Sequence, residues 1–226
     1  MSRRLLVQDL GLRPYAEVLE LQRALAQRRL SGELKDDLLL LVEHEPVVTL
    51  GRGTQPRSLP LSAAELARRG VQQFEVERGG DVTFHGPGQL VGYPILDLRQ
   101  HREDLHWYLR TLEDALIAGL DELGIEAGRN PGLTGVWTRG RKIGSIGIHV
   151  KQWVTFHGFA LNVNTDLSYF ELIVPCGIRD VVMTSVALEL GRTDPTAIWR
   201  ETRQAVVEGM AEAFGATPVE AALALA

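Results

Sequence analysis

A lone cysteine is the first residue of this sequence whose type and setting suggest chemistry. Cys176 is the only cysteine, and it lies between Pro175 and Gly177. Proline and glycine favour a turn, which exposes a side chain, whereas inert cysteines more often lie within apolar strands or helices. An exposed thiol that ionises is a strong nucleophile. From the residues alone, a reactive thiol and an inert one both remain open.

A lysine in an apolar run is the second such feature. Lys142 opens a glycine-interrupted stretch that ends at Val150. If this stretch is a strand, strict alternation places Lys142, Gly144, Ile146 and Ile148 on one face, which could line an apolar channel. The alternative is a strand-end lysine that extends into water.

The third feature is a glycine-rich segment, residues 78–89. It packs four glycines, an arginine, a histidine and a proline into twelve residues, and it leads into the apolar run Leu90–Ile95. Glycines let backbone N–H groups approach a ligand closely, so the segment is a candidate substrate cradle. A simple glycine-rich turn is the other interpretation.

Several classes of protein are excluded by the remaining composition. A single cysteine forms neither an internal disulfide nor a cysteine-rich zinc site, and the six histidines lack metal-ligand spacing, so we expect no metal. The net charge of −5 argues against nucleic acid as a partner. No signal-peptide core follows Met1, and the longest strongly apolar stretch, Leu38–Val42, is too short to span a bilayer. We therefore expect a cytoplasmic protein without membrane contact.

Periodicity and capping signals predict an α+β fold for one domain over residues 1–226. Strands arrive in pairs or runs between helices, which favours a mixed, largely antiparallel sheet with packed helices. The predicted strands are 5–7, 38–42, 47–50, 74–77, 90–96, 135–138, 142–150 and 154–163. The predicted helices are 15–30, 62–69, 105–123 and one that begins after Asp194, with Pro195 at its first position.

Taken together, four blocks resemble the lipoyl(octanoyl) transferase family, in order and in spacing. The resemblance covers the chain from Leu38 to Gly191. Phe84 stands where this family commonly has tyrosine, Gly144 where it has alanine, and His149 where it has arginine. The blocks are residues 78–89, Lys142–Gly147, His157–Asn164 and Pro175–Gly177.

The resemblance implies a fold and a set of roles. The fold is that of the biotin and lipoate protein ligase catalytic domain, over a core of about residues 30–217. Cys176 corresponds to the acyl-thioester nucleophile and Lys142 to the residue that lowers its pKa. The substrate-binding positions would be Arg78, Gly79, Gly80, Asp81, Val82, Thr83, Phe84, His85, Ser145, Ile146, Gly147, Gly158, Phe159 and Ala160.

The same resemblance implies the reaction and its partners. An octanoyl or lipoyl group would pass from acyl carrier protein through a cysteine thioester to a lysine of lipoyl domains, in 2-oxoacid dehydrogenase complexes and the glycine cleavage H protein. No cofactor is implied, because conversion of a thioester to an amide is downhill. Three alternatives stay open: octanoyl transfer between protein lysines, an ATP-dependent lipoate or biotin protein ligase, and an acyl-protein binding module with an inert thiol.

One segment of opposite charge to the rest of the chain predicts where the acidic carrier docks. Residues 127–165 contain Arg129, Arg139, Arg141, Lys142 and Lys151 but no Asp or Glu. We expect this basic stretch, which includes the candidate base, to steer the carrier by its charge.

Overall fold

The computed structural model describes residues 3–174 and 181–222, so Cys176 lies outside the described residues. An eight-stranded sheet dominates the fold, with strand order β11-β1-β2-β6-β10-β9-β8-β7. Strand β1 pairs in parallel with β2 and β11, and the other neighbours in this sheet pair antiparallel. The strands are β1 (Arg3–Arg13), β2 (Asp37–His44), β6 (Gln89–Ile95), β7 (Gly128–Asn130), β8 (Leu133–Thr138), β9 (Arg141–Lys151), β10 (Val154–Asn162) and β11 (Ala216–Glu220).

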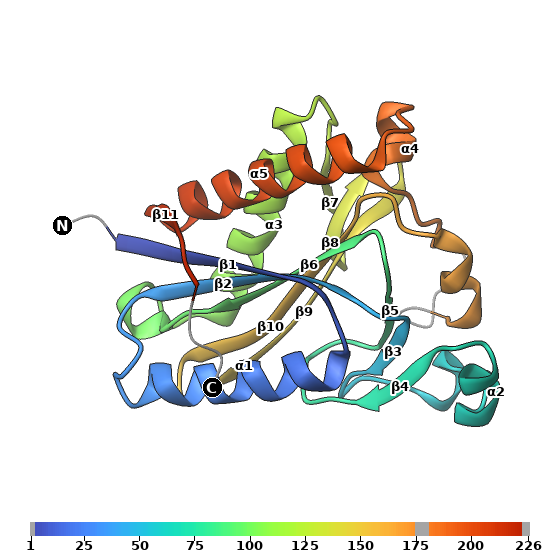
Figure 1. The fold of residues 1–226 in the computed structure, drawn as a ribbon, viewed down its shortest axis with the longest axis horizontal. Coiled ribbons are helices and arrows are strands. Elements are labelled where there is room, and N and C mark those ends of the chain that lie inside the picture. Colours follow the sequence, from blue (N-terminus) through green and yellow to red (C-terminus); the bar gives the residue numbers. More distant parts are fainter. Residues whose placement is uncertain (1–2, 175–180, 223–226) are drawn as a thin grey trace.

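A second sheet of three strands lies at one end of the first. Its order is β4-β3-β5, with β3 parallel to β4 and antiparallel to β5. Figure 1 shows it beside helix α2, at the end of the large sheet away from the N-terminus. The strands are β3 (Val47–Leu50), β4 (Gln72–Glu75) and β5 (Val82–His85), and α2 spans Ala63–Arg68. The predicted mixed, largely antiparallel α+β fold is confirmed.

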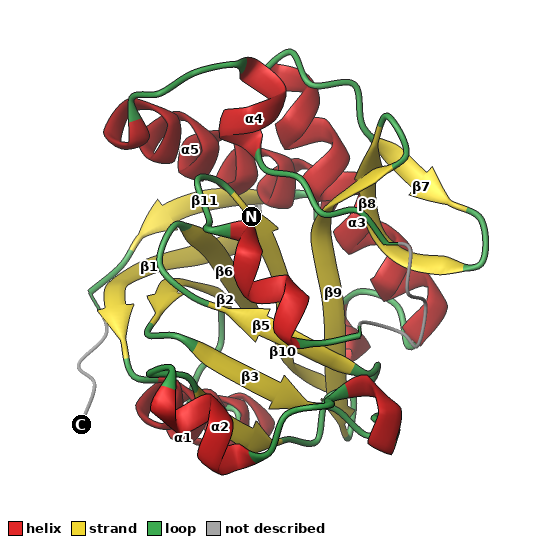
Figure 2. Ribbon diagram, turned by 90° about the vertical axis from the view of Figure 1, so that its right-hand side faces the viewer, coloured by secondary structure: helices red, strands yellow, loops and turns green. Residues whose placement is uncertain are grey.

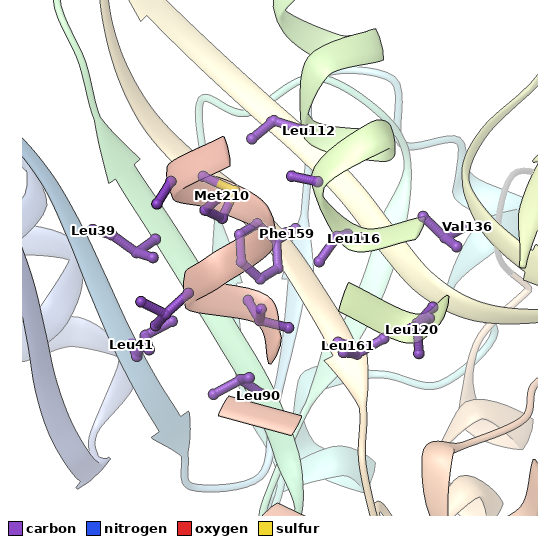
Figure 3. Close-up of a cluster of buried hydrophobic side chains, with 14 of the residues drawn as sticks. Leu39, Leu41, Leu90, Leu112, Leu116, Leu120, Val136, Phe159, Leu161 and Met210 are labelled. Carbon is purple, nitrogen blue, oxygen red and sulfur yellow. The ribbon is translucent and has the colours of Figure 1, made fainter. Parts of the chain in front are cut away.

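Helices cover both faces of the large sheet. Helices α3 (Leu105–Glu122) and α5 (Pro195–Ala213) lie together on one face, and α1 (Tyr15–Leu30) lies on the other (Figure 1). The main core cluster fills the space under α3 and α5, where strand residues such as Leu41 and Leu161 meet Leu116 and Met210 (Figure 3). Short helices complete the fold: α4 (Val186–Leu190) and the 3₁₀ turns Pro56–Ser58, Leu98–Gln100 and Leu167–Leu172.

Local sequence signals explain where the helices begin. Ser62 and Glu65 form the predicted capping box at α2, each side chain meeting the other's backbone N–H. Asp194 caps α5 by accepting hydrogen bonds from the Thr196 and Ala197 N–H groups. These contacts satisfy N–H groups that have no partner within the helix.

Other elements escaped prediction. We expected one loop over residues 78–89, but residues 82–85 form β5, with Val82 and Phe84 buried and Thr83 half-buried between them. Strands β7 and β11 and helix α4 were not predicted either, because each is too short to show a period. Figure 2, which faces the small sheet, shows β3 and β5 lying across β9 and β10 of the large sheet.

Candidate active site

A cavity of about 350 Å³ lies between the two sheets. Its size is typical of small-molecule sites. The start of α1 contributes Tyr15, and β6 contributes Val91 and Tyr93. The cavity gathers nearly all of the predicted site residues in the described part of the chain: Arg78, Gly79, Gly80, Asp81, Val82, Thr83, His85, Lys142, Ser145, Ile146, Gly147, Gly158, Phe159 and Ala160.

Phe84 is the exception among the predicted substrate-binding positions. Its ring is 1% exposed and packs with Val48 and Leu66 in a separate core cluster under the small sheet. It stacks on Tyr169 with ring centroids 4.6 Å apart. Phe84 does not line the cavity, although its strand neighbours Val82, Thr83 and His85 do. Its side chain therefore supports β5 and does not line the site.

Small residues form the wall that β9 and β10 present to the cavity. Gly147 lies opposite Gly158, and Ser145 lies opposite Ala160. A Cβ on Gly158 would overlap the backbone of Gly92 in β6, and one on Gly147 would lie 3.0 Å from the Gly79 carbonyl. Because these positions have no side chain, the backbone of β6 approaches Gly158 closely, and the backbone at Gly79 approaches Gly147 closely.

The loop of residues 76–81, here called the Arg78 loop, forms the wall of the cavity opposite β9 and β10. Hydrogen bonds fix this loop on both sides. The Gly79 N–H donates to the Ile148 carbonyl at 2.8 Å, and the Gly53 N–H donates to the Gly80 carbonyl at 2.9 Å. Arg78 is 6% exposed, and its Nη2 donates to the carbonyl and hydroxyl oxygens of Thr49 at 2.8 and 2.9 Å. The guanidinium thus ties the loop to β3 from within.

Asp81 fixes the end of the same loop. Its carboxylate accepts hydrogen bonds from the Ser58 hydroxyl and the Val82 N–H, both at 2.7 Å. A side chain held from two directions loses little further freedom when a ligand binds. The loop is therefore a preorganised wall of the cavity.

Lys142 lies at one end of the cavity, where the β8–β9 pairing changes register. Val136 pairs with Gly144, but Trp137 pairs with Lys142. Strand β9 therefore holds one extra residue, Ile143, at this point. Such a β-bulge interrupts the alternation of side chains along a strand.

The bulge overturns one prediction about this strand. Ile146 and Ile148 pack against the main core cluster beneath α3 and α5. Lys142, Ser145 and Gly147 line the cavity, and Ile146 and Ile148 border it as well. Strict alternation does not hold between Lys142 and Gly144, because Ile143 is an extra residue there, although Lys142, Ile146 and Ile148 all line the cavity as predicted.

Described residues on either side of Cys176 are held by backbone hydrogen bonds. Before it, the Val174 N–H donates to the Ser58 carbonyl at 2.8 Å. After it, the Lys142 N–H donates to the Val182 carbonyl at 2.8 Å, and the Thr184 N–H donates to the Lys142 carbonyl at 2.9 Å. Cys176 itself lies outside the described residues, so its predicted role stays a prediction.

Buried, neutral histidines characterise the other end of the cavity. Gln89 donates through Nε2 to two oxygens, so its Oε1 accepts from His85 Nδ1 at 2.7 Å. His44 donates through Nδ1 to the Arg13 carbonyl at 3.1 Å and accepts from the Tyr93 hydroxyl at 2.7 Å. Burial lowers the pKa of His85 to about 3 and that of His44 to about 4. Both rings are uncharged at neutral pH.

Three further residues at this end were missed as site residues. Tyr15 lines the cavity and stacks on His85, with ring centroids 6.1 Å apart. His157 is buried with φ of 56°, and burial lowers its pKa to about 4. His157 belongs to a motif that we had noted, and Tyr93 lies in a predicted strand, but no sequence signal marks Tyr15, which the fold brings from the start of α1.

The basic segment is less positive in space than in sequence. Arg141 forms an ion pair with Glu189 of α4 at 2.8 Å, and Arg139 lies 3.8 Å from the same carboxylate. Arg129 pairs with Glu113 and Asp114 of α3. Acidic side chains from other elements offset much of the charge that we counted along residues 127–165.

Neither a metal-binding cluster nor a membrane-spanning helix occurs in the described residues. No group of three or more histidine, cysteine, aspartate or glutamate side chains in residues 3–174 and 181–222 is arranged to hold a metal ion. Within the same ranges, no helix combines the length and the apolar character needed to cross a membrane.

Sequence comparisons decide the family. The family model for the lipoyl protein ligase A/B catalytic domain matches residues 14–212. An octanoyltransferase from Solibacter usitatus is 54% identical over 182 residues, which cover 80% of this chain and 82% of the relative. The chain belongs to the octanoyltransferase family. Another member, from Rubrobacter xylanophilus, is 52% identical over 209 residues and 91% of each chain.

The fold is shared more widely than the sequence. A solved lipoate-protein ligase A bound with ATP superposes with a TM-score of 0.77 at 18% identity, covering 100% of this chain and 90% of that one. This likeness confirms the predicted lipoate-ligase fold. Because that ligase binds ATP on the same fold, the fold does not by itself separate an octanoyltransferase from an ATP-dependent ligase.

Proposed function

We propose that this octanoyltransferase moves an octanoyl group from acyl carrier protein to a lysine of lipoyl domains, through a thioester on Cys176. Residues 1–226 act as one catalytic domain, and no nucleotide is consumed. The placement of Lys142 carries the proposal: it lines a cavity with small-residue walls, and residues 182–184, shortly after Cys176 in the chain, pair with it.

The first half-reaction transfers the acyl group to the enzyme. A free thiol has a pKa near ~8.5, and an adjacent ammonium lowers it by stabilising the thiolate. The Cys176 sulfur attacks the carbonyl carbon of the donor thioester, and a tetrahedral oxyanion forms. Backbone N–H groups of the glycine-rich turns are the donors that this chain offers to that oxyanion. The carbon–sulfur bond to the carrier breaks, and the carrier thiol leaves with a proton from Lys142.

The second half-reaction transfers the acyl group to the acceptor. Lys142 is neutral after the first step, so it can accept a proton from the incoming lysine amine. The amine nitrogen attacks the thioester carbon, the bond to Cys176 breaks, and an amide forms. The departing thiolate is again beside a charged Lys142, which restores the starting state.

The acyl chain fits the wall formed by β9 and β10. Ser145, Gly147, Gly158 and Ala160 line one side of the cavity with small residues, which we call the trough. The Arg78 loop closes the trough on the other side. We place the carbonyl at the Lys142 end and the methyl end near the buried histidines.

The family membership supports a proposal for the partners and the compartment. The donor is an octanoyl-acyl carrier protein, and the acceptors are lipoyl domains of 2-oxoacid dehydrogenase complexes and the glycine cleavage H protein. The activity is placed in the cytoplasm, where reducing conditions keep a lone catalytic thiol free.

Intact-mass measurement tests the covalent step directly. Wild-type protein mixed with octanoyl-acyl carrier protein, without nucleotide, should gain one octanoyl group, and Cys176→Ser should gain none while keeping its fold. A requirement for ATP would favour a ligase. Acylation from an octanoylated lipoyl domain, with none from the carrier, would favour transfer between protein lysines.

Two substitutions of Lys142 separate its charge from its basicity. Lys142→Ala should raise the pKa of the Cys176 thiol and lower transfer by about 100-fold or more. Lys142→Arg should restore thiolate but little transfer, because a guanidinium does not act as a base in proteins. Thiol alkylation against pH, measured beside transfer, checks both. Full transfer by the arginine variant would reduce the role of Lys142 to its charge.

A further inference from the structure

We propose that strand β8 is a platform that positions the Lys142 ammonium, through the bare backbone of Gly135, the ring of Trp137 and the buried carboxylate of Glu113. These are positioning residues that act through Lys142. The proposal rests on the function proposed for Lys142 and goes beyond it, because it identifies what fixes the base in place.

Gly135 makes room for the lysine side chain. A Cβ built on Gly135 would lie 2.8 Å from Cε and 3.4 Å from Nζ of Lys142. It would also lie 2.5 Å from the Gly144 carbonyl oxygen, on the neighbouring strand. Real side-chain carbons essentially never approach other atoms within 3.0 Å, as this Cβ would approach the Gly144 oxygen and Cε of Lys142. The end of the Lys142 side chain therefore rests on the Gly135 backbone, at a place that only glycine leaves open.

Trp137 supports the charged end of the same side chain. It lies two residues after Gly135, and both residues approach the Lys142 side chain. The Lys142 Nζ atom lies 5.6 Å from the ring centroid, within the range at which a cation is attracted to an aromatic face. Trp137 is 7% exposed, so this contact is largely shielded from water.

Glu113 of α3 fixes the backbone of the platform at Gly135. Its side chain is 1% exposed on α3, and its Oε1 accepts a hydrogen bond from the Gly135 N–H at 3.1 Å. Its Oε2 accepts from Arg110 at 2.6 Å and from Arg129 at 2.7 Å. Two arginines compensate a buried carboxylate that would otherwise be strongly destabilising. The result is a fixed Gly135 backbone at the point where the β8–β9 register shifts.

The arrangement has a catalytic consequence. A free lysine side chain samples many rotamers, whereas proton transfer requires its nitrogen within hydrogen-bond reach of the reacting groups. Backbone contact beneath Cε and an aromatic face near Nζ restrict that sampling before substrate arrives. Disturbing the platform should therefore lower kcat and raise the thiol pKa, while KM changes little.

Gly135→Ala tests the platform, with Gly140→Ala as its matched control. Gly140 lies in the β8–β9 turn with φ of 75°, and a Cβ there would meet no described atom within 4 Å. Gly135→Ala should lower kcat about 100-fold, as displacement of a catalytic group by an ångström does. Its thiol alkylation profile should move to higher pH. Gly140→Ala should match wild type in both readouts.

If Gly135→Ala does not fold, variants of Trp137 and Glu113 test whether the platform positions Lys142. Trp137→Leu should lower kcat about tenfold and shift the alkylation profile, and Trp137→Phe should recover most of both because it keeps an aromatic face. Glu113→Gln should shift the profile in the same direction. Folded Gly135→Ala or Trp137→Leu with wild-type kcat and thiol profile would overturn the platform, provided that Lys142→Ala is impaired. If Lys142→Ala is itself unimpaired, the function proposed for Lys142 fails instead.

Discussion

The two faces of strand β10 meet opposite demands within one run of residues. Phe159 and Leu161 turn large side chains towards α3 and α5, where they are 2% and 0% exposed. Ala160, between them, and Gly158, beside them, line the cavity with a methyl group and bare backbone, and Phe159 borders it as well. At this end of β10 one face fills the main core with large side chains and the other carries small residues, whereas Val154 and Phe156 further along pack in a second core cluster beneath α1.

The difference extends to polarity. The face under α3 and α5 is apolar throughout the main core cluster. The cavity is lined by Lys142, His85 and His157, and His44 packs on His85 with ring centroids 5.9 Å apart. We propose that acyl recognition and pH dependence depend chiefly on the second face, although that face also carries a buried apolar cluster beneath α1. Three predictions test this division.

The largest effect should come from the core face. Leu161→Ala removes a fully buried side chain and should lower the free energy of unfolding by about 3 kcal/mol, since large-to-small substitutions in cores lose both transfer energy and packing. Ala160→Gly, on the other face, should lose only about 1 kcal/mol. Urea unfolding of both variants gives the comparison. Equal losses would mean that the two faces contribute alike.

Acid should destabilise the protein through the cavity face. The folded pKa values of His44 and His157 are about 4 and that of His85 is about 3, below the unfolded value of 6.5. The stability that they contribute is fully present above pH 6.5 and is lost as the pH falls towards 4, because the unfolded state binds protons first. The contribution of each histidine to the free energy of unfolding should fall by about 2 kcal/mol between pH 7 and pH 5.

A matched pair of histidine variants isolates this contribution. His44→Asn should reduce the loss of stability between pH 7 and pH 5, measured by urea unfolding at each pH. His106 is exposed on the first turn of α3, so His106→Gln should leave the pH dependence unchanged. A pH dependence that is the same in His44→Asn and wild type would exclude His44 as a source.

The smallest effect should come from filling the trough. Ser145→Leu adds methylene groups opposite Ala160 and should lower kcat/KM for an octanoyl thioester about tenfold, the effect of a few misplaced methylenes in an apolar pocket. A butanoyl thioester should react nearly as with wild type, because its chain ends earlier. Ser31→Leu, on the exposed end of α1, serves as the control. An equal loss with both thioesters would place the acyl chain elsewhere.

Local signals made much of the fold predictable. The helix over residues 15–30 has the predicted bounds, and the capping box of Ser62 and the Asp194 cap lie where the sequence indicated. These features depend on residues within a few positions of one another. Strand β5 and the bulge at Ile143 were not predictable in this way, because each depends on pairing with a strand that is remote or irregular in register.

The sequence by itself determined the family, the mixed α+β fold and the grouping of most candidate site residues, since these depend on ordered motifs and short-range patterns. Only the tertiary structure decided that Lys142 and Tyr15 line the cavity and that Phe84 packs in a separate core cluster. It also showed that Glu189, from a distant helix, offsets Arg139 and Arg141. The physical reason is common to all four: side-chain direction and local charge depend on neighbours that the fold brings together from distant parts of the chain.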